Sequence, residues 1–241
     1  EAVYGLYAAK SGDDHVELYS DENKTVVLTR FEFLRKQEER EDPNYCLADY
    51  IAPKGSGLSD YMGLFAVTAG TGIEKKLQEF NKDHDDYSQI MLKVLADRLA
   101  EALAEWLHFK IRTNDWGYAS EEAFEIENIL KESYQGIRPA PGYPACPDHT
   151  EKEGLFGLLE ASRHTGVALT ESFAMFPTAA VSGYYFSHPE AKYFAVGKIN
   201  SKVVSSATSS SIKLTSMAKV TSTVSSVGTP PPATAGLFKS K

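Results

Sequence analysis

The chain of 241 residues contains only two cysteines, Cys46 and Cys146. Two cysteines cannot build a disulfide framework or a four-cysteine zinc site within this chain alone. We therefore predict no structural metal and expect a protein of the reducing cytoplasm.

Long apolar runs are also missing from the sequence. No run reaches the roughly 20 residues that cross a bilayer as a helix, and the N-terminus has neither a basic leader nor an initiating methionine. We expect no membrane partner, and we interpret Glu1 as the cut end of a longer protein.

Acidic residues are absent from Asn200 onward, where five lysines lie among serines and threonines. The whole chain has a formal charge of −8, so without those five lysines the rest carries −13. An acidic body argues against a nucleic-acid surface. Residues 200–241 show little periodicity and are predicted to be a disordered tail.

The remaining sequence has enough apolar residues for a core, at 42% of the whole chain. Residues 3–29, 45–52 and 61–68 have the composition of strands, and a polar helix is expected to follow through Phe80. Residues 181–186 and 192–199 have the pattern of a hairpin with a five-residue loop. Residues 85–112 show the longest helical periodicity.

That long helix carries three stripes. A wide apolar stripe is made by Ile90, Leu92, Val94, Leu95, Leu99, Leu103, Trp106 and Leu107. Ala96, Ala100 and Ala104 form a ridge of small side chains, which favours close approach of a sheet or a second helix. Asp97, Glu101 and Glu105 form an acidic ridge, which is typical of a solvated face; the alternative is a surface for a partner or a cationic ligand.

The segment Arg138–Lys152 is the most informative part of the sequence. Four prolines fix its backbone and exclude helix interior and central strand, so an ordered loop is expected. Gly142 allows a turn or a close ligand approach, Arg138 supplies a cationic fork and Tyr143 an aromatic face. Thr150 and Glu153 have the spacing of a capping box, so we expect a helix N-terminus beside Arg138 and a ligand with an anionic end.

This loop, together with residues 44–50, 96–102 and 169–175, closely resembles the activation domain of cobalamin-dependent methionine synthase. The resemblance covers roughly Val3 to Ile199. It implies an α+β fold with a twisted antiparallel sheet and flanking helices. Residues 1–199 are then an activation domain truncated at its N-terminus, without the upstream Ile-Asp-Trp segment whose acid contacts the ligand in the family.

The resemblance also implies a ligand and its site. The motif Arg-x-x-x-Gly-Tyr, here Arg138, Gly142 and Tyr143, binds S-adenosylmethionine in the family. By position the resemblance adds the following residues: Ala140 through its backbone, the aromatic pair Tyr193 and Phe194, and the acids Asp97 and Glu101. No catalytic residue is implied, because the nucleophile is cob(I)alamin, carried by another module.

The function implied is reductive reactivation of a methyltransferase, 5-methyltetrahydrofolate-homocysteine methyltransferase, whose homocysteine, folate and cobalamin modules lie outside this chain. The partners implied are the cobalamin-binding module and a flavodoxin or diflavin reductase.

Two alternatives stay open. One is a Rossmann-like nucleotide-binding oxidoreductase using Gly70 and Gly72, although Lys75 stands where the third glycine of that motif belongs. The other is a ligand-free fragment that docks to a reductase through its acidic helix.

Overall fold

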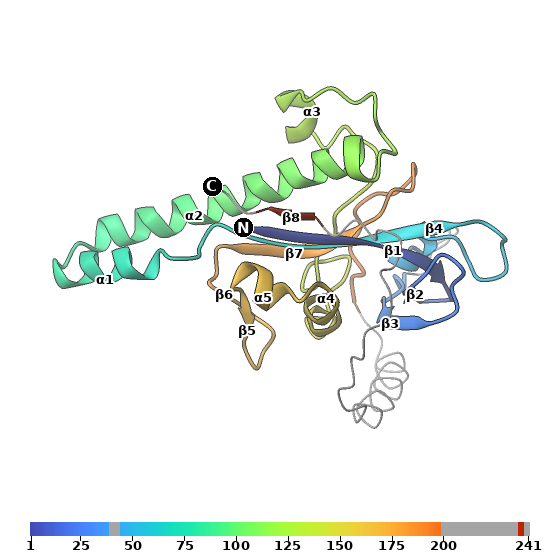
Figure 1. Cartoon of the computed structure of the whole chain (residues 1–241), viewed down its shortest axis with the longest axis horizontal. Helices are drawn as coiled ribbons and strands as arrows, with labels where there is room; N and C mark the ends of the chain where they lie inside the picture. Colours follow the sequence, from blue (N-terminus) through green and yellow to red (C-terminus); the bar gives the residue numbers. More distant parts are fainter. Residues whose placement is uncertain (39–43, 199–235, 239–241) are drawn as a thin grey trace.

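The computed structural model describes residues 1–38, 44–198 and 236–238. An antiparallel sheet lies at its centre, with strand order β3-β2-β1-β4-β7 (Figure 1). The strands are β1 (Ala2–Ser11), β2 (His15–Tyr19), β3 (Val27–Glu32), β4 (Asp60–Thr68) and β7 (Ala180–Tyr185). This architecture confirms the predicted α+β fold class.

The antiparallel register rules out the Rossmann-like alternative. β1 pairs with β4 from Ala2 opposite Val67 to Ala9 opposite Asp60, and β4 pairs antiparallel with β7 on its other side. A dinucleotide fold requires parallel neighbours at the strand that leads into the glycine turn. Gly70 instead packs against Pro177 and Ala179, where an added Cβ would lie 2.9 Å from the proline ring.

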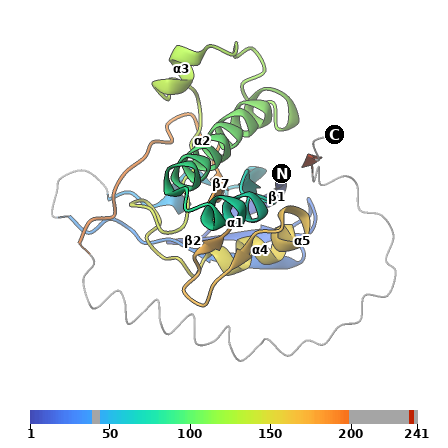
Figure 2. The same ribbon diagram turned by 90° about the vertical axis from the view of Figure 1, so that its left-hand side faces the viewer.

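Side chains alternate between the two faces of this sheet, and both faces are buried. Tyr4, Phe65 and Tyr185 belong to one core cluster, shared with the C-terminal half of a long helix. Val3, Leu64 and Tyr184 belong to the other, shared with two short helices. The result is a three-layer arrangement with helices above and below the sheet (Figures 1 and 2).

The long helix is α2 (Asp86–Lys110), which continues into a π-helical turn, η2 (Ile111–Asp115). Its first turn is capped by Asp85, whose carboxylate accepts a hydrogen bond from the Ser88 N–H at 2.9 Å. The alanine ridge is the buried side of α2: Ala96, Ala100 and Ala104 are all at most 3% exposed, and Ala104 belongs to the core cluster of Phe65 and Tyr185. The expectation of a small-residue contact is therefore confirmed.

The apolar stripe is mostly exposed in this structure. Ile90, Val94, Leu95 and Leu99 are 46–63% exposed. They lie on the N-terminal half of α2, which extends beyond the sheet with α1 (Glu74–Lys82) beside it (Figure 1). Periodicity identified the helix correctly, but the sheet is too short to cover all of its apolar residues.

On the opposite face lie α4 (Lys152–Leu159) and α5 (Ala161–Thr165), separated by Glu160 in a left-handed conformation. Gly166 ends α5 with φ +74, as expected from its position. A two-stranded hairpin of β5 (Ala168–Leu169) and β6 (Met175–Phe176) follows. The remaining helix, α3 (Ile126–Leu130), is short and has no buried residue.

Two predicted strands are wrong. Residues 45–52 contain the 3-10 helix η1 (Leu47–Tyr50), which buries Leu47, Ala48 and Tyr50. Residues 192–198 form no strand, because the edge of β7 is already taken by another segment. The Tyr184 N–H donates to the Pro139 carbonyl at 2.9 Å, and Ile137 forms a bridge with Phe186.

Most of the predicted disordered tail, 200–241, lies outside the described residues. Gly236–Phe238 differs from that expectation: it forms β8, which pairs antiparallel with Ala2–Tyr4 of β1. No helix within 1–38 and 44–198 is long and apolar enough to cross a membrane.

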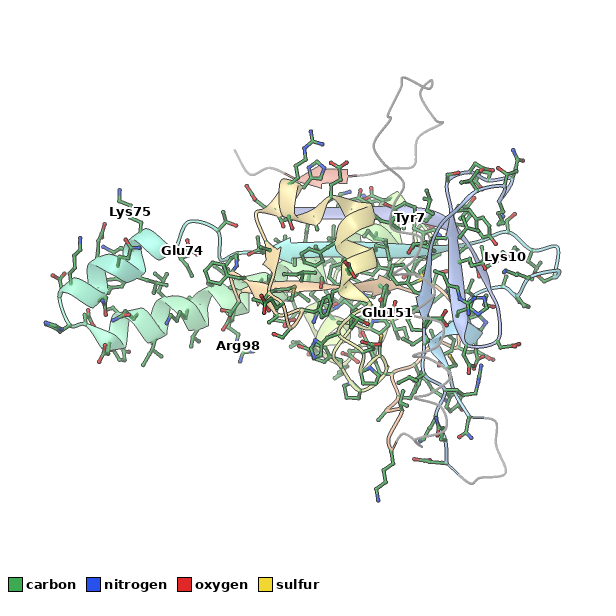
Figure 3. The ribbon with its side chains drawn as sticks, turned by 90° about the horizontal axis from the view of Figure 1, so that it is seen from below. Tyr7, Lys10, Glu74, Lys75, Arg98 and Glu151 are labelled. Carbon is green, nitrogen blue, oxygen red and sulfur yellow. The ribbon has the colours of Figure 1, made fainter. Side chains whose placement is uncertain are left out.

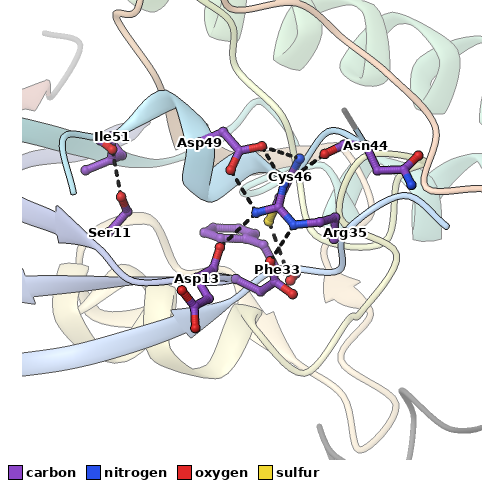
Figure 4. A network of polar contacts seen from close by, with 9 residues as sticks. Ser11, Asp13, Phe33, Arg35, Asn44, Cys46, Asp49 and Ile51 are labelled. Carbon is purple, nitrogen blue, oxygen red and sulfur yellow. Dashed lines mark hydrogen bonds and ion pairs between the residues drawn. The ribbon is translucent and has the colours of Figure 1, made fainter. Parts of the chain in front are cut away.

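Arg35 joins the β1–β2 turn to η1 (Figure 4). Its guanidinium donates to both carboxylate oxygens of Asp49, to Asp14 and to the carbonyls of Asp13 and Asn44, all at 2.7–2.8 Å. A polar pocket of about 560 Å³ surrounds these groups. Since the guanidinium is so fully paired, we interpret this network as structural.

The alanine ridge gives the first testable prediction. Ala104 is fully buried among Phe65, Leu107 and Tyr185, so Ala104→Leu overfills this contact and should lower the free energy of unfolding by about 1–3 kcal/mol. Ala102→Leu, at an exposed position of the same helix, is the matched control. Urea unfolding measures both variants, and equal midpoints would contradict packing through the ridge.

Glu151 gives a second prediction. It precedes α4 and lies well inside the body, whereas Glu74, Lys75 and Arg98 lie on the protruding arm (Figure 3). Its carboxylate accepts a hydrogen bond from the Glu32 N–H at 3.3 Å, and burial raises its pKa to about 8. The folded state thus binds this proton more tightly than the unfolded chain, whose Glu pKa is 4.5. Stability should fall as pH rises from about 4.5 to about 8.

Glu151→Gln removes that titration. Above pH 8 the parent buries a charged carboxylate and the variant does not, so the variant should be more stable by about 1–2 kcal/mol. This figure is smaller than the full pKa shift would give, because Glu151 keeps some contact with solvent. The difference should shrink toward pH 4.5. Thermal unfolding across this range tests it, with exposed Glu153→Gln as the control. A pH-independent difference would show that Glu151 is not the group that titrates.

Candidate functional site

The loop from Arg138 to Glu151 is ordered, as its prolines predict, and its own backbone holds it. The Gly142 N–H donates to the Cys146 carbonyl at 2.7 Å, and the Cys146 N–H to the Tyr143 carbonyl at 2.9 Å. On its outer side the Val196 N–H donates to the Pro144 carbonyl at 2.9 Å. The segment that was expected to pair with β7 therefore covers the loop instead.

Two glycines let the loop adopt this path. Gly142 has φ +95, and a Cβ there would lie 2.2 Å from Cε1 of His149. Gly183 of β7 faces the loop from the sheet, and a Cβ there would lie 2.6 Å from the Pro139 carbonyl oxygen. Side chains at either position would push the loop out of place.

A pocket of about 270 Å³ opens beside this loop. Five parts of the chain contribute to it: the loop itself, α2, the stretch after α3, strand β7 and the segment that follows β7. Its lining residues are Glu101, Glu132, Arg138, Pro139, Ala140, Tyr143, Pro144, Ala145, Val181, Tyr193 and Phe194. Cationic, anionic and aromatic groups thus meet in one small space, as in sites for a polar organic ligand.

Arg138 is the cation of the pocket and is largely buried, with 18% of its side chain exposed. Its Nη2 donates to Oε2 of Glu105 at 2.8 Å. Burial lowers the pKa of Arg138, but the Glu105 carboxylate outweighs burial and raises it above the ordinary value. The buried Nε of Arg138 has no hydrogen-bond partner among the described residues. Because Glu105 takes only one of the five N–H groups, the guanidinium can donate to a further anion.

The aromatic walls are partly open to solvent. Tyr143 is 63% exposed and Tyr193 is 42% exposed. The Tyr193 hydroxyl accepts a hydrogen bond from the Arg138 N–H at 3.0 Å, which ties the post-β7 segment to the loop. Burial raises the pKa of Tyr193 above its ordinary value, so this hydroxyl stays protonated near neutral pH. Phe194 packs against Tyr45.

The structure brings together most of the residues predicted for the site. Arg138, Ala140, Tyr143, Tyr193, Phe194 and Glu101 line one pocket. Gly142 and Asp97 do not line it: Gly142 shapes the loop from behind, and Asp97 lies two helical turns from Glu105 on an exposed part of α2.

Sequence reasoning missed Glu132 and Glu105 as site groups. Glu132 lies in an irregular stretch after α3 with a left-handed backbone, φ +51, which no sequence pattern indicates. Glu105 was recognised only as part of the acidic ridge. Its four-residue spacing from Glu101 was a usable signal, since residues i and i+4 share one helix face.

The expected helix N-terminus beside Arg138 is wrong. No residue of α4 lines the pocket. Glu151 precedes the helix in a helical conformation and makes no side-chain cap, so the predicted capping box of Thr150 and Glu153 does not form. Lys152 is buried and its Nζ lies 2.7 Å from Nδ1 of His149. The first turn of α4 therefore packs under the loop.

Behind the pocket lies a layer of buried polar side chains. Arg112 is fully buried, binds both carboxylate oxygens of Glu122 and lies 3.8 Å from the Tyr134 ring centroid. Burial, with Arg112 and Arg138 nearby, holds the pKa of His108 well below its usual range, so His108 is neutral. No group of three or more metal-ligand side chains occurs in the part of the chain that the structure describes.

Comparisons with known proteins agree on one family. Residues 1–210 match the family described as "Vitamin B12 dependent methionine synthase, activation domain". A solved structure titled "Crystal Structure of the MetH Reactivation Domain bound to AdoHcy" is 52% identical in sequence, with a TM-score of 0.85. The match covers 87% of this chain and 65% of that one, so this chain spans less than two thirds of its relative.

The loop geometry gives a third prediction. Gly142→Ala combines a left-handed backbone with overlap on the His149 ring, and should lower the free energy of unfolding by about 1–3 kcal/mol. Gly157→Ala is the matched control, because a Cβ there meets nothing within 4 Å. It lies within α4 and should stabilise the protein by about 0.5–1 kcal/mol. Chemical denaturation measures the free energy of unfolding of both variants. A Gly142→Ala protein as stable as the parent would contradict the described loop conformation.

Proposed function

The chain belongs to the activation-domain family of vitamin B12 dependent methionine synthases, and on that premise we propose that its Arg138 pocket binds S-adenosylmethionine. The observation that carries the proposal is the guanidinium of Arg138, which lines a pocket while only its Nη2 donates to a protein group among the described residues. The relative of known structure is bound to AdoHcy, the demethylated form of this ligand.

The chemistry of the pocket fits each part of that ligand. Arg138 suits the carboxylate of the amino-acid end, because guanidinium and carboxylate form charge-assisted hydrogen bonds. Glu101 and Glu132 supply negative charge near the sulfonium. Tyr143, Tyr193 and Phe194 offer faces for the adenine ring and for the cation. The pocket therefore carries a complementary group for the anionic, cationic and aromatic parts of one molecule.

The protein's part in catalysis is then positional. When bound, S-adenosylmethionine supplies a methyl group to the reduced cobalamin of another module. Arg138 and the aromatic walls fix the ligand's orientation, and the rigid proline loop lowers the entropy lost on binding. None of the lining residues needs to act as a nucleophile or a general base.

The same reasoning extends to partners and location. We propose that the partners are the cobalamin-binding module of the same methyltransferase and a flavodoxin or diflavin reductase, and that the protein works in the cytoplasm. Family membership supports the first partner. The acidic face of α2 at Asp97 and Glu101, which borders the pocket, is the surface we expect cobalamin to approach.

Arg138→Ala tests the ligand assignment. The variant should bind S-adenosylmethionine more weakly by about 2–3 kcal/mol, because a charge-assisted hydrogen-bond partner of the carboxylate is lost. Isothermal titration calorimetry on the 241-residue chain measures the difference. Arg163→Ala is the control, because Arg163 forms an exposed ion pair with Glu160 away from the pocket.

Equal affinity in Arg138→Ala and the parent chain would contradict the proposed site. Binding of a nicotinamide nucleotide with no affinity for S-adenosylmethionine would contradict the proposed function itself. Loss of affinity in Arg163→Ala as well would indicate a general effect of charge, since that residue is remote from the pocket.

A further inference from the structure

The acidic ridge of α2 divides into three different environments. Asp97 is exposed, Glu101 lines the pocket, and Glu105 is partly buried, with 20% of its side chain exposed. The three carboxylates are spaced by four residues and share one helix face. Only Glu105, the one nearest the C-terminal end of α2, contacts Arg138.

Glu105 is the only carboxylate within ion-pair distance of Arg138 in the part of the chain that the structure describes. The other charged or titratable neighbours do not form this contact: Glu101 and Glu132 line the same pocket, but neither forms an ion pair with Arg138 in the described part of the chain. His108 is buried and neutral, and Arg112 is a cation already paired with Glu122. Tyr134 and Tyr185 contribute buried hydroxyls that have no hydrogen-bond partner among the residues that the structure describes. Among the described residues, the Arg138 guanidinium therefore forms one ion pair.

That contact uses only part of each group. Arg138 donates from Nη2 and Glu105 accepts at Oε2. Within the described part of the chain, Nε of Arg138 and Oε1 of Glu105 have no hydrogen-bond partner. A guanidinium has five N–H groups, so one hydrogen bond to Glu105 leaves most of its donors available. The guanidinium is thus held from the α2 side while it lines the pocket.

We propose that Glu105 is a positioning residue for ligand binding, which fixes the Arg138 guanidinium so that its remaining donors meet the ligand's carboxylate. This inference rests on the proposed function. A long arginine side chain loses rotamer entropy when it is ordered. A guanidinium already ordered by Glu105 loses less when the ligand binds, so the carboxylate is bound more tightly.

The opposite arrangement is competition, in which the ligand's carboxylate displaces Glu105 from Arg138. Displacement would leave a partly buried carboxylate without its cation and beside a second anion. Both effects are unfavourable, because burial of an unpaired charge is costly and like charges repel. The two arrangements predict opposite signs for the removal of the Glu105 charge.

Glu105→Gln separates them, because it removes the charge and keeps the size of the side chain. With S-adenosylhomocysteine as probe, calorimetry of the full 241-residue chain should show affinity about five- to tenfold lower than in the parent, part of what a charged hydrogen bond contributes. With 5′-methylthioadenosine, which lacks the amino-acid end, affinity should be unchanged. Tighter binding of S-adenosylhomocysteine would show competition and overturn the proposal.

A double-substitution experiment tests whether Glu105 acts through Arg138. In the Arg138→Ala background, Glu105→Gln should cause no further loss of affinity for S-adenosylhomocysteine. A further loss of similar size would mean that Glu105 contacts the ligand directly, and would overturn the positioning role. Glu122→Gln is the matched control: it disturbs a neighbouring buried arginine pair, Arg112–Glu122, and should change the affinities for both probes alike or not at all.

A crystal structure of Glu105→Ala gives a readout that does not depend on ligand binding. The Arg138 side chain should leave its place in the pocket, and an unchanged guanidinium would overturn the proposal. Failure of the parent chain to bind S-adenosylhomocysteine would count against the proposed function instead. The two failures are therefore distinguishable.

Discussion

The close contact between α2 and the sheet is the constraint on which the rest of this structure depends. Ala104 packs in one core cluster with Phe65 of β4 and Tyr185 of β7, and Ala96 and Ala100 are buried on the same ridge; such small side chains let the helix approach closely. The contact sets the rotation of the helix. It therefore decides that Glu101 and Glu105 lie over the proline loop and that the larger apolar side chains of the N-terminal half remain exposed.

A second close approach completes the site from the sheet side. The loop takes the edge of β7 through Ile137 and Pro139, which leaves no room for a further strand. Gly183 makes this possible, and Gly142 turns the chain back over His149. The segment after β7 then crosses the loop and brings Tyr193 to the Arg138 backbone. Backbone contacts and two glycines thus place the aromatic wall of the pocket.

The charged groups in and behind the pocket also depend on a few specific contacts. The pocket combines one largely buried cation with the carboxylates of Glu101 and Glu132. Behind it, Arg112 is neutralised by Glu122 and His108 carries no charge. Arg138, held by Glu105, is therefore the positive group that lines the pocket. Such an arrangement suits a ligand that has both an anionic and a cationic part, which is the character of the proposed ligand, S-adenosylmethionine.

The sequence by itself determined the strands β1 to β4, the length of α2, its alanine contact and the ordered proline loop, because periodicity and proline chemistry are local properties. The motif with Arg138 and Tyr143, and the pair Tyr193 and Phe194, were also identifiable in advance. Only the tertiary structure decided that Glu105 pairs with Arg138, that Glu132 joins the pocket and that residues 192–198 cover the loop. Those outcomes depend on contacts between segments far apart in the chain, for which local sequence patterns carry no signal.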